Sequence, residues 1–288
     1  MQPATKLDST AIMQLNERRQ MAVLAELSDE HEPLPAGHGG GTVAFMAGAD
    51  WLCSAIGCNL DSPLTLDGAR RVHEYVASRG GRPRLDLTDQ SGKAAFQVVS
   101  QAGFVLDHAE RVLARDLAQP IETPEVPGMV IERLNTQDRD DVLRHARHTI
   151  AGFTPPGQPL PESEIESAVR AQLHERSRGF WALVDGKPAT ACGMEVVAIS
   201  QTPNDPPIRI ASLWGAVVAE PYRRRGIQQA LIAHRLKQGL AEGCTLALIE
   251  CEPGIPTERN ARRLGFTLAY TRLVFKEPAA GGSPARRG

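Results

Sequence analysis

The sequence predicts the α/β fold class, with a mixed (α+β) arrangement in which a central sheet of parallel and antiparallel strands is flanked by helices. Apolar runs of strand length alternate with amphipathic helical patterns in both halves of the chain, which is typical of layered α/β structures. The run "LALI" at residues 246–249 lacks the alternation of a half-exposed strand, and this predicts a strand covered on both faces in a parallel pair. The stretch "AQPIETPEVPG" at residues 118–128 is rich in proline and has no apolar period, so it predicts a linker. We therefore expect two domains, at residues 1–117 and 129–277, and a disordered tail at residues 278–288.

The composition excludes several classes of protein. With 42% hydrophobic and 23% charged residues, the 288-residue chain has an ordinary globular composition. A formal net charge of −2 gives no general attraction to nucleic acid or anionic lipid, so any anion site must be local. The N-terminus has no uninterrupted apolar segment, and no stretch is long and apolar enough to span a membrane. We expect a soluble, cytoplasmic protein with neither a membrane nor a nucleic acid as its partner.

The cysteines and histidines indicate no metal site. The five cysteines form no CxxC pair and no ligand pattern with histidine, which argues against a disulfide framework and a zinc site. Most lie in apolar runs and are expected to be small core residues: Cys53, Cys58, Cys192, Cys244 and Cys251. The histidines at positions 145, 148 and 234 fall on predicted helices, where packing or surface roles are the commoner ones. We assign no metal.

The N-terminal half opens with a predicted helix. Ser9 and Thr10 are suitable N-cap residues, and apolar residues follow at helical spacing. The glycine-rich stretch "PLPAGHGGG" precedes a strand and has no GK[ST] after it, so it predicts a loop and no phosphate site. The expected elements then alternate as strand "TVAFMAG", helix "SPLTLDGARRVHEYVASRG", strand "RPRLDLTD", helix "GKAAFQVVSQAG" and strand "FVLDHAERVLARDL".

The C-terminal half begins a second α/β series. The pair Asp185 and Gly186 between two apolar runs predicts a hairpin. The expected elements are strand "MVIERL", helix "DRDDVLRHARHTIAGF", a helix over residues 164–175, the hairpin strands "GFWALVDG" and "KPATACGMEVVAI", strand "IRIASLWGAVVAE", a helix over residues 226–242, strand "CTLALIECE", the short helix "PTERNARRLG" and strand "FTLAYTRLVFKE".

An anion site is predicted where the apolar run "LWGAVVA" passes into "EPYRRRGIQQALI". A helix start leaves backbone N–H groups unpaired and carries the positive end of the helix dipole, so it binds phosphate oxygens. Gly226 lacks a Cβ that would keep a phosphate from the backbone, and Arg223, Arg224 and Arg225 add positive potential. From spacing alone, nucleotides, coenzyme A and plain phosphate all remain open.

The same stretch resembles the coenzyme-binding motif of the GNAT superfamily of acyl-CoA-dependent N-acyltransferases, [QR]-x-x-G-x-[GA]. Arg223, Gly226 and Gln228 occupy its three defining positions, and Gln228 departs from the usual small residue. The downstream "PGIPTERNARRLGFTLAYTR" is similar to the closing segment of the family, a short helix that leads to a Gly-Phe pair, here Gly265 and Phe266. The resemblance covers roughly residues 128–277.

The resemblance implies a GNAT domain at residues 129–277, in which one strand separates from its parallel neighbour and acyl-CoA lies in the gap. The cofactor would be acetyl-CoA. Its pantetheine arm would lie along the backbone of residues 216–218, and the amides of residues 224–228 would hold its pyrophosphate. The resemblance implies these cofactor-binding residues: Ala216, Val217, Val218, Arg223, Arg224, Arg225, Gly226, Ile227, Gln228 and Asn260. The pair Gly103-Phe104 matches Gly265-Phe266. Residues 1–117 therefore resemble a degenerate GNAT-like domain, which would give a tandem arrangement with one competent coenzyme site.

Acyl transfer to an amine needs a proton acceptor for the amine and can use a proton donor for the leaving thiolate. Many family members use a tyrosine four residues before the closing Gly-Phe pair, and here that residue is Ala261. Carboxylates at strand ends are candidate bases, and nearby polar groups could order a water or face the sulfur. The candidate catalytic residues are Glu195, Glu252, Asn260 and Tyr270. Thr257 fits the N-cap of the short helix instead, and Cys251 has no histidine partner, so direct transfer is preferred.

These observations predict an acetyl-CoA-dependent N-acetyltransferase that acts on a primary amine of a small molecule or a protein. The alternative is a catalytically weak acyl-CoA-binding or sensor module, for which the absent tyrosine argues. Neither the identity of the acceptor nor the oligomeric state follows from the sequence, and a homodimer stays open.

Overall fold

The structure is a computed structural model that describes residues 7–202 and 204–278. The chain divides into two compact units. Unit 1 consists of Met1–Leu15 and Arg111–Ala269, and unit 2 consists of Asn16–Glu110 and Tyr270–Gly288. The expected tail lies outside the described residues, apart from Pro278.

Three elements give residues to both units: α1 (Ser9–Leu27), β5 (Val105–Asp116) and β11 (Thr267–Lys276). The compact units consequently differ from the domains expected from the sequence. The expected linker, residues 118–128, carries no helix or strand and lies inside unit 1. An assignment of two GNAT-like domains to residues 1–117 and 129–277 stays a prediction.

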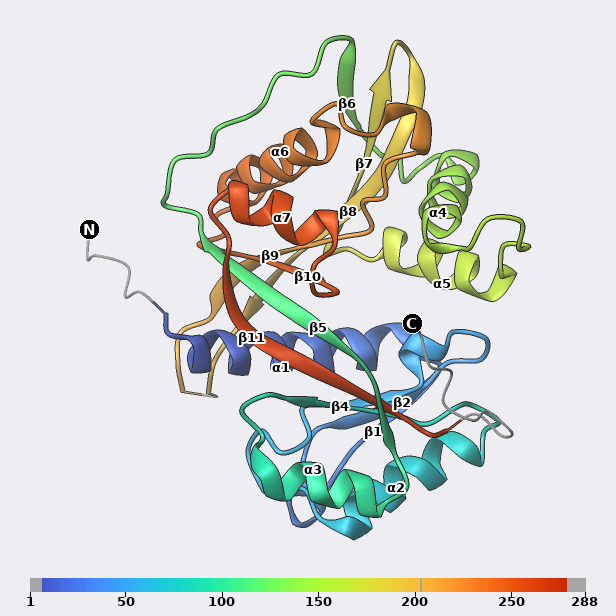
Figure 1. The fold of residues 1–288 in the computed structure, drawn as a ribbon, viewed down its shortest axis with the longest axis vertical. Coiled ribbons are helices and arrows are strands. Elements are labelled where there is room, and N and C mark those ends of the chain that lie inside the picture. The colour runs from blue at the N-terminus through green and yellow to red at the C-terminus, as the bar shows by residue number, and fades with distance from the viewer. Residues whose placement is uncertain (1–6, 203, 279–288) are drawn as a thin grey trace. The chain divides into compact units, whose positions relative to one another are not determined.

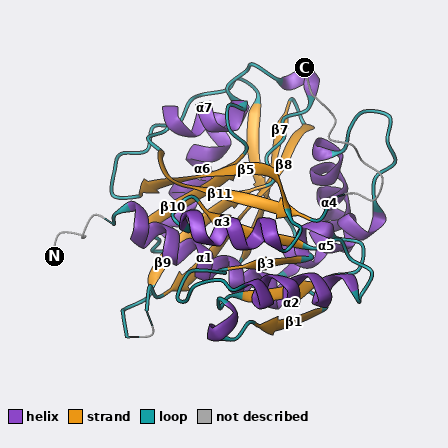
Figure 2. Ribbon diagram, turned by 60° about the horizontal axis from the view of Figure 1, so that its bottom comes forward, coloured by secondary structure: helices purple, strands orange, loops and turns teal. Residues whose placement is uncertain are grey.

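Unit 2 is a small mixed sheet with helices (Figures 1 and 2). Its strands follow the order β1-β2-β3-β4-β11, in which β3 and β4 are parallel and the other neighbours are antiparallel. Two short strands, β1 and β3, are not predicted from the sequence, because they are too short to show a period. The elements are β1 (Glu30–Pro33), η1 (Ala36–His38), β2 (Thr42–Phe45), η2 (Asp50–Leu52), β3 (Ser54–Ile56), α2 (Leu66–Ala77), β4 (Arg84–Thr88) and α3 (Gly92–Gln101).

Unit 1 contains a longer mixed sheet in the order β5-β10-β9-β8-β7-β6. All pairs are antiparallel except β9 with β10, so the predicted parallel strand is confirmed. The hairpin turns at Asp185 and Gly186, both with positive φ, as a two-residue turn of this kind requires. The elements are β6 (Met129–Arg133), α4 (Arg139–Phe153), α5 (Glu162–Leu173), β7 (Ser177–Val184), β8 (Lys187–Ile199), β9 (Ile208–Trp214), η3 (Glu220–Tyr222), α6 (Ile227–Ala241), β10 (Leu246–Cys251) and α7 (Pro256–Arg263).

Helices cover both faces of the unit 1 sheet, with α4 and α5 on one side and α6 and α7 on the other (Figures 1 and 2). Leu231, Ile232 and Leu236 of α6 are fully buried in the core that forms against the sheet. Burial of such side chains contributes roughly 1.5–3 kcal/mol each, so the helix is firmly anchored. The rigid helix places its first turn at the carboxyl end of β9.

The two Gly-Phe pairs adopt the same local structure, each within its own unit. Gly103 and Gly265 have φ of 89° and 84° and end α3 and α7. In each pair the glycine amide donates to the carbonyl three residues earlier, and the phenylalanine amide donates to the carbonyl five residues earlier. Phe104 and Phe266 are both buried. This paired helix-capping motif agrees with the internal similarity seen in the sequence.

All five cysteines are free and buried, as predicted for core residues. Burial raises the pKa of the Cys58 thiol to about 12 and that of Cys251 to about 11, which leaves both as unreactive thiols at neutral pH. Within the part of the chain that the structure describes, no helix combines the length and apolar character needed to cross a membrane.

Candidate functional site

The site begins where β9 and β10 separate. Their parallel register ends with the pair Leu213 and Ile249. Beyond it, residues 215–219 continue beside β8, where the Ala219 amide donates to the Ala189 carbonyl at 2.9 Å. The sequence predicted a strand through residue 220, whereas β9 ends at Trp214. The apolar run is real, but its second half lacks a ladder partner on the β10 side.

Two glycines and a helix shape this separation. Gly215 has a φ of +77°, and a Cβ on Gly193 would lie 2.3 Å from the Trp214 ring, so neither position accepts a larger residue without a shift. On α4, a Cβ on Gly152 would lie 2.6 Å from Cβ of Val217. The absence of side chains at these positions lets α4 pack directly against the separated segment.

The separated segment presents backbone groups to the gap. In an extended chain, successive residues point their N–H and C=O groups to opposite sides, and Ala219 points toward β8. Ala216 and Val218 therefore point the other way. Their carbonyls accept hydrogen bonds from the side chains of Gln228 (Nε2, 3.3 Å) and Arg223 (Nε, 3.1 Å), whereas their amides have no partner among the described residues.

The loop that follows ends at the free N-terminus of α6. Gly226 occupies the N-cap position with a φ of 80°, and no side chain caps the helix. Arg224 also has a positive φ of 64°, a conformation that costs a non-glycine residue about 1 kcal/mol or more. The backbone amides of residues 224–228 donate no hydrogen bond within the described part of the chain. Such a series of unpaired amides at a helix start is an anion-binding arrangement.

The three arginines add charge at this helix start. Arg223, Arg224 and Arg225 are exposed, and within the described residues none of them forms an ion pair with a carboxylate. Their positive charge is therefore available to an anionic ligand. The structure thus brings the predicted pyrophosphate residues and the predicted pantetheine segment together at one end of the sheet.

A network of side-chain amides connects this loop with α7. Gln228 Nε2 also donates to the Thr257 hydroxyl at 2.9 Å, and the Asn260 amide donates to Gln228 Oε1 at 2.6 Å. Gln229 Nε2 donates to Asn260 Oδ1 at 3.0 Å. The long side chain of Gln228, where the motif usually has a small residue, makes this network possible.

Thr257 does not have its predicted role. The N-cap of α7 is Ile255, and Pro256 takes the first helical position, where its fixed φ suits a helix start. Thr257 lies one residue further on, and its hydroxyl faces Gln228. The interpretation of Thr257 as an N-cap is therefore wrong.

Two of the candidate carboxylates differ in environment. Trp181 contacts the α4 histidines and pairs with Ala191, so by strand alternation Glu195 lies on the α4 side of the sheet. Glu195 is 7% exposed, and Arg176 Nε lies 3.2 Å from its carboxylate. Glu252 follows β10 and is exposed.

Tyr270 lies in unit 2 and is 1% exposed. Its hydroxyl donates to the Glu17 carboxylate at 2.6 Å and accepts from the Asn16 amide at 2.8 Å. Arg272 Nη2 lies 2.8 Å from the same carboxylate of Glu17. Tyr270 is thus part of a buried polar network, and this geometry gives no support to a role in proton transfer. The sequence pattern could not show this, because the partners are more than 250 positions apart.

Glu258 is a structural residue of the site that the sequence analysis missed. It is buried, and its carboxylate accepts from the Gly254 amide at 2.7 Å, from Arg111 and from Arg262. These bonds, the one from Gly254 first, lower the pKa of Glu258 to about 2. Glu258 fixes the turn between β10 and α7, and an acidic residue in a first helical turn was the available signal.

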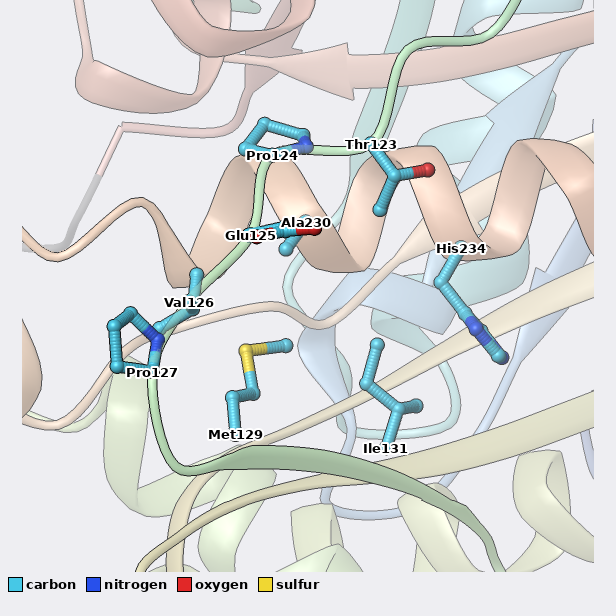
Figure 3. Close-up of a pocket in the computed structure, with 9 residues that line it drawn as sticks. All are labelled: Thr123, Pro124, Glu125, Val126, Pro127, Met129, Ile131, Ala230 and His234. Atoms are coloured by element: carbon cyan, nitrogen blue, oxygen red, sulfur yellow. The ribbon is translucent and has the colours of Figure 1, made fainter.

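The expected linker passes over α6 and lines a cavity of about 550 Å³ (Figure 3). Pro124, Val126 and Pro127 of the linker line it on one side, Met129 and Ile131 lie across from them, and Ala230 comes from α6. Val126 Cγ2 lies 3.7 Å from the position that a Cβ on Gly226 would take. The linker therefore passes close to the backbone at Gly226.

The comparisons with known proteins agree with this geometry. Residues 146–266 match the model of the family described as "Acetyltransferase (GNAT) family". The search of curated proteins found no match.

Solved structures show a similar fold over nearly the whole chain. One is a GCN5-related N-acetyltransferase from Kribbella flavida, with a TM-score of 0.63 and 18% identity over 92% of this chain and 96% of that chain. A second is a tandem GNAT protein from the clavulanic acid biosynthesis pathway, with a TM-score of 0.60 and 14% identity over 95% and 98%. A third is a functionally unknown conserved protein from Staphylococcus epidermidis ATCC 12228, with a TM-score of 0.59 and 8% identity over 83% and 91%. At these identities the similarity shows the fold, and it confirms the predicted fold class.

Proposed function

We propose that this chain transfers an acetyl group from acetyl-CoA to a primary amine of a small molecule or a protein, and the match of residues 146–266 to the GNAT family model supports this. The observation that carries the proposal is the gap between β9 and β10, since it opens toward the free N-terminus of α6. Acetyl-CoA is the acetyl donor of the family, so the acyltransferase assignment and the predicted cofactor are confirmed at the level of the family.

The residues present fit acetyl-CoA. Its pantetheine arm carries amide groups, and the free amides of Ala216 and Val218 offer complementary backbone donors. Its pyrophosphate is an anion, and the unpaired amides of residues 224–228 and the three exposed arginines offer donors and positive charge. When bound, acetyl-CoA supplies the thioester carbonyl that the amine attacks.

The chain's own residues would assist in two ways. An amide of the separated segment that points into the gap can stabilise negative charge on a carbonyl oxygen, as oxyanion holes do. Glu195 is the buried carboxylate on the α4 side of the sheet, and it would take the amine proton, directly or through water. Glu252 is the exposed alternative, and Asn260 would orient the coenzyme through the network with Gln228.

A second candidate function, a sensor module that binds acyl-CoA with little turnover, is favoured by one observation. Ala261, at the position of the usual tyrosine, is fully buried, and the hydroxyl of Tyr270 is engaged in unit 2. Neither residue offers a proton donor to a leaving thiolate, so turnover would depend on water or on Asn260.

Calorimetric titration with acetyl-CoA, followed by thiol release with a panel of amines, tests both functions. We expect the wild type to bind acetyl-CoA and the double variant Arg225→Glu, Gly226→Asp to lose this binding, because it places carboxylates among the unpaired amides. Release of coenzyme A with at least one amine supports the enzyme, and binding without any amine-dependent release supports the sensor. No binding to the wild type would refute both.

If turnover is found, Glu195→Gln and Glu252→Gln identify the base. The variant that removes the base should lower kcat and abolish the acidic limb of the pH–rate profile, and the other should leave that limb in place. Equal profiles for all three proteins would show that neither carboxylate takes the proton.

A further inference from the structure

Arg235 of α6 is buried in an unusual way. It is 1% exposed, and its Nη1 donates to the carbonyls of Gly193 at 2.8 Å and Trp214 at 3.1 Å. Its Nε donates to the Leu231 carbonyl of its own helix at 3.2 Å. Nη2 has no hydrogen-bond partner within the described residues, and no carboxylate there forms an ion pair with this guanidinium.

Stability alone gives a poor account of this arginine. A buried guanidinium loses its hydration, and without a carboxylate partner only carbonyl dipoles compensate for the loss. This desolvation lowers the pKa of Arg235. The neighbouring inward positions of the helix are aliphatic, as at Leu231, Ile232 and Leu236, so the packing of the core does not by itself call for a guanidinium here.

Its two carbonyl partners identify what the arginine does. Gly193 and Trp214 are register partners, and they form the last pair of the β8–β9 ladder at this end. The parallel ladder with β10 ends one residue earlier, at Leu213, and Gly215 then turns with a φ of +77°. Arg235 therefore binds both strands from the α6 side at the place where β9 ends and the separated segment begins.

We propose that Arg235 is a positioning residue for the coenzyme. By binding the carbonyls of Gly193 and Trp214, it fixes the direction in which residues 215–218 leave the sheet. The amides of Ala216 and Val218 are thereby aimed into the gap, where they lie without partners. Arg235 acts through this backbone and does not contact the coenzyme. The part that concerns the coenzyme rests on the proposed function.

Two variants and one control test the proposal. Arg235→Met keeps an unbranched side chain of shorter reach and leaves both carbonyls without this donor, and Arg235→Lys retains one donor group of smaller reach. Ile232→Val removes a methylene group from a fully buried position of the same helix, so it reports how acetyl-CoA affinity responds to a general loss of stability.

The measurements are the melting temperature, acetyl-CoA affinity, KM and kcat, and amide exchange of residues 214–218 in the ligand-free protein. We expect the amides of this segment to exchange faster in Arg235→Met. We also expect this variant to bind acetyl-CoA about tenfold more weakly, since the misaligned amides of Ala216 and Val218 would lose one or two hydrogen bonds to the coenzyme. KM for acetyl-CoA should rise, KM for the amine should not, and Arg235→Lys should restore part of the affinity. Ile232→Val should lower only the melting temperature.

The proposal is overturned if Arg235→Met exchanges and binds as the wild type does, or if its loss of affinity follows the melting temperature as in Ile232→Val. Should Arg235→Met fail to fold, the comparison of Arg235→Lys with Ile232→Val decides between the same outcomes. Amide exchange needs no coenzyme. Faster exchange in an enzyme that never binds acetyl-CoA would therefore refute the proposed function and leave the backbone role of Arg235 intact.

Discussion

Gly226 and Gly243 allow a paired test of the proposed coenzyme-binding loop at residues 223–226. They lie at the start and just after the end of the same helix, α6, both with a φ of +80°. A Cβ on Gly226 would meet Val126 at 3.7 Å, and one on Gly243 would meet Arg209 at 3.8 Å. Neither contact is a clash, so the two substitutions to alanine differ only in what lies in front of the backbone.

The cost in stability should be the same for both variants. Alanine in this left-handed conformation costs roughly 1–2 kcal/mol, and the smaller entropy of its unfolded chain returns about 0.4–1 kcal/mol. The net loss is about 1 kcal/mol, which lowers the melting temperature of a domain of this size by about 2–4 °C. Only Gly226→Ala should also weaken acetyl-CoA binding, by about tenfold or more, because the methyl group crowds the amides at the helix start.

Thermal unfolding and calorimetric titration of the two variants check this prediction. The expected pattern is equal melting temperatures with unequal affinities. Equal affinities would refute the reasoning, since they would show that the backbone at Gly226 does not approach the ligand. A much lower melting temperature for Gly226→Ala than for Gly243→Ala would point to the contact with Val126 instead.

Three further predictions concern buried polar groups. Tyr270→Phe should cost about 1–3 kcal/mol of unfolding free energy, because buried Asn16 and Glu17 each lose a hydrogen-bond partner, and should leave kcat unchanged; a large drop in kcat at unchanged stability would restore the catalytic role. Glu258→Gln should lower the free energy of unfolding, measured with urea at pH 7, by about 1–3 kcal/mol. Since the pKa of Glu258 in the folded protein is about 2, the greater stability of the wild type should persist above pH 4.5 and disappear as the pH falls toward 2. Desolvation lowers the pKa of fully buried His145 from 6.5 to about 4, so the folded protein binds this proton less readily than the unfolded chain does. Up to about 3 kcal/mol of unfolding free energy is therefore present above pH 6.5 and is lost as the pH falls toward 4. His145→Gln should flatten this dependence of stability on pH.

The loop at residues 223–226 and the helix start after it were predictable, because their signals are local. Gly226 and the arginines beside it lie within four consecutive positions, between an apolar run and a helical period, and the structure gives Gly226 the positive φ that only glycine adopts freely. The gap between β9 and β10 was expected from the resemblance. The run of apolar residues by itself predicted an uninterrupted strand, because the loss of a ladder partner leaves no trace in hydrophobicity.

The environment of single side chains was not predictable. The sequence pattern predicts Arg235 to be a solvated cation on an amphipathic helix, yet its side chain is buried and donates hydrogen bonds to two strand carbonyls. The sequence presents Tyr270 as a strand residue near a family motif, yet its hydroxyl bonds to Asn16 and Glu17 of the first helix. Both depend on which distant segments pack beside them, and a single sequence contains no direct record of that packing.

The two units differ at equivalent helix starts, and this predicts how many coenzymes one chain binds. In unit 2, α2 follows the parallel strand β3 as α6 follows β9 in unit 1. The side chain of Thr65 caps α2 and accepts the Gly68 amide at 3.2 Å, and the Met21 sulfur lies 2.3 Å from where a Cβ on Gly57 would be, directly after β3. The cap occupies the Gly68 amide and a side chain packs where the preceding strand ends, so this helix start offers a pyrophosphate fewer amides and less room than that of α6 does. Titration of the full chain with acetyl-CoA should therefore give one site per chain, and a stoichiometry of two would show that the cap of α2 opens for a ligand.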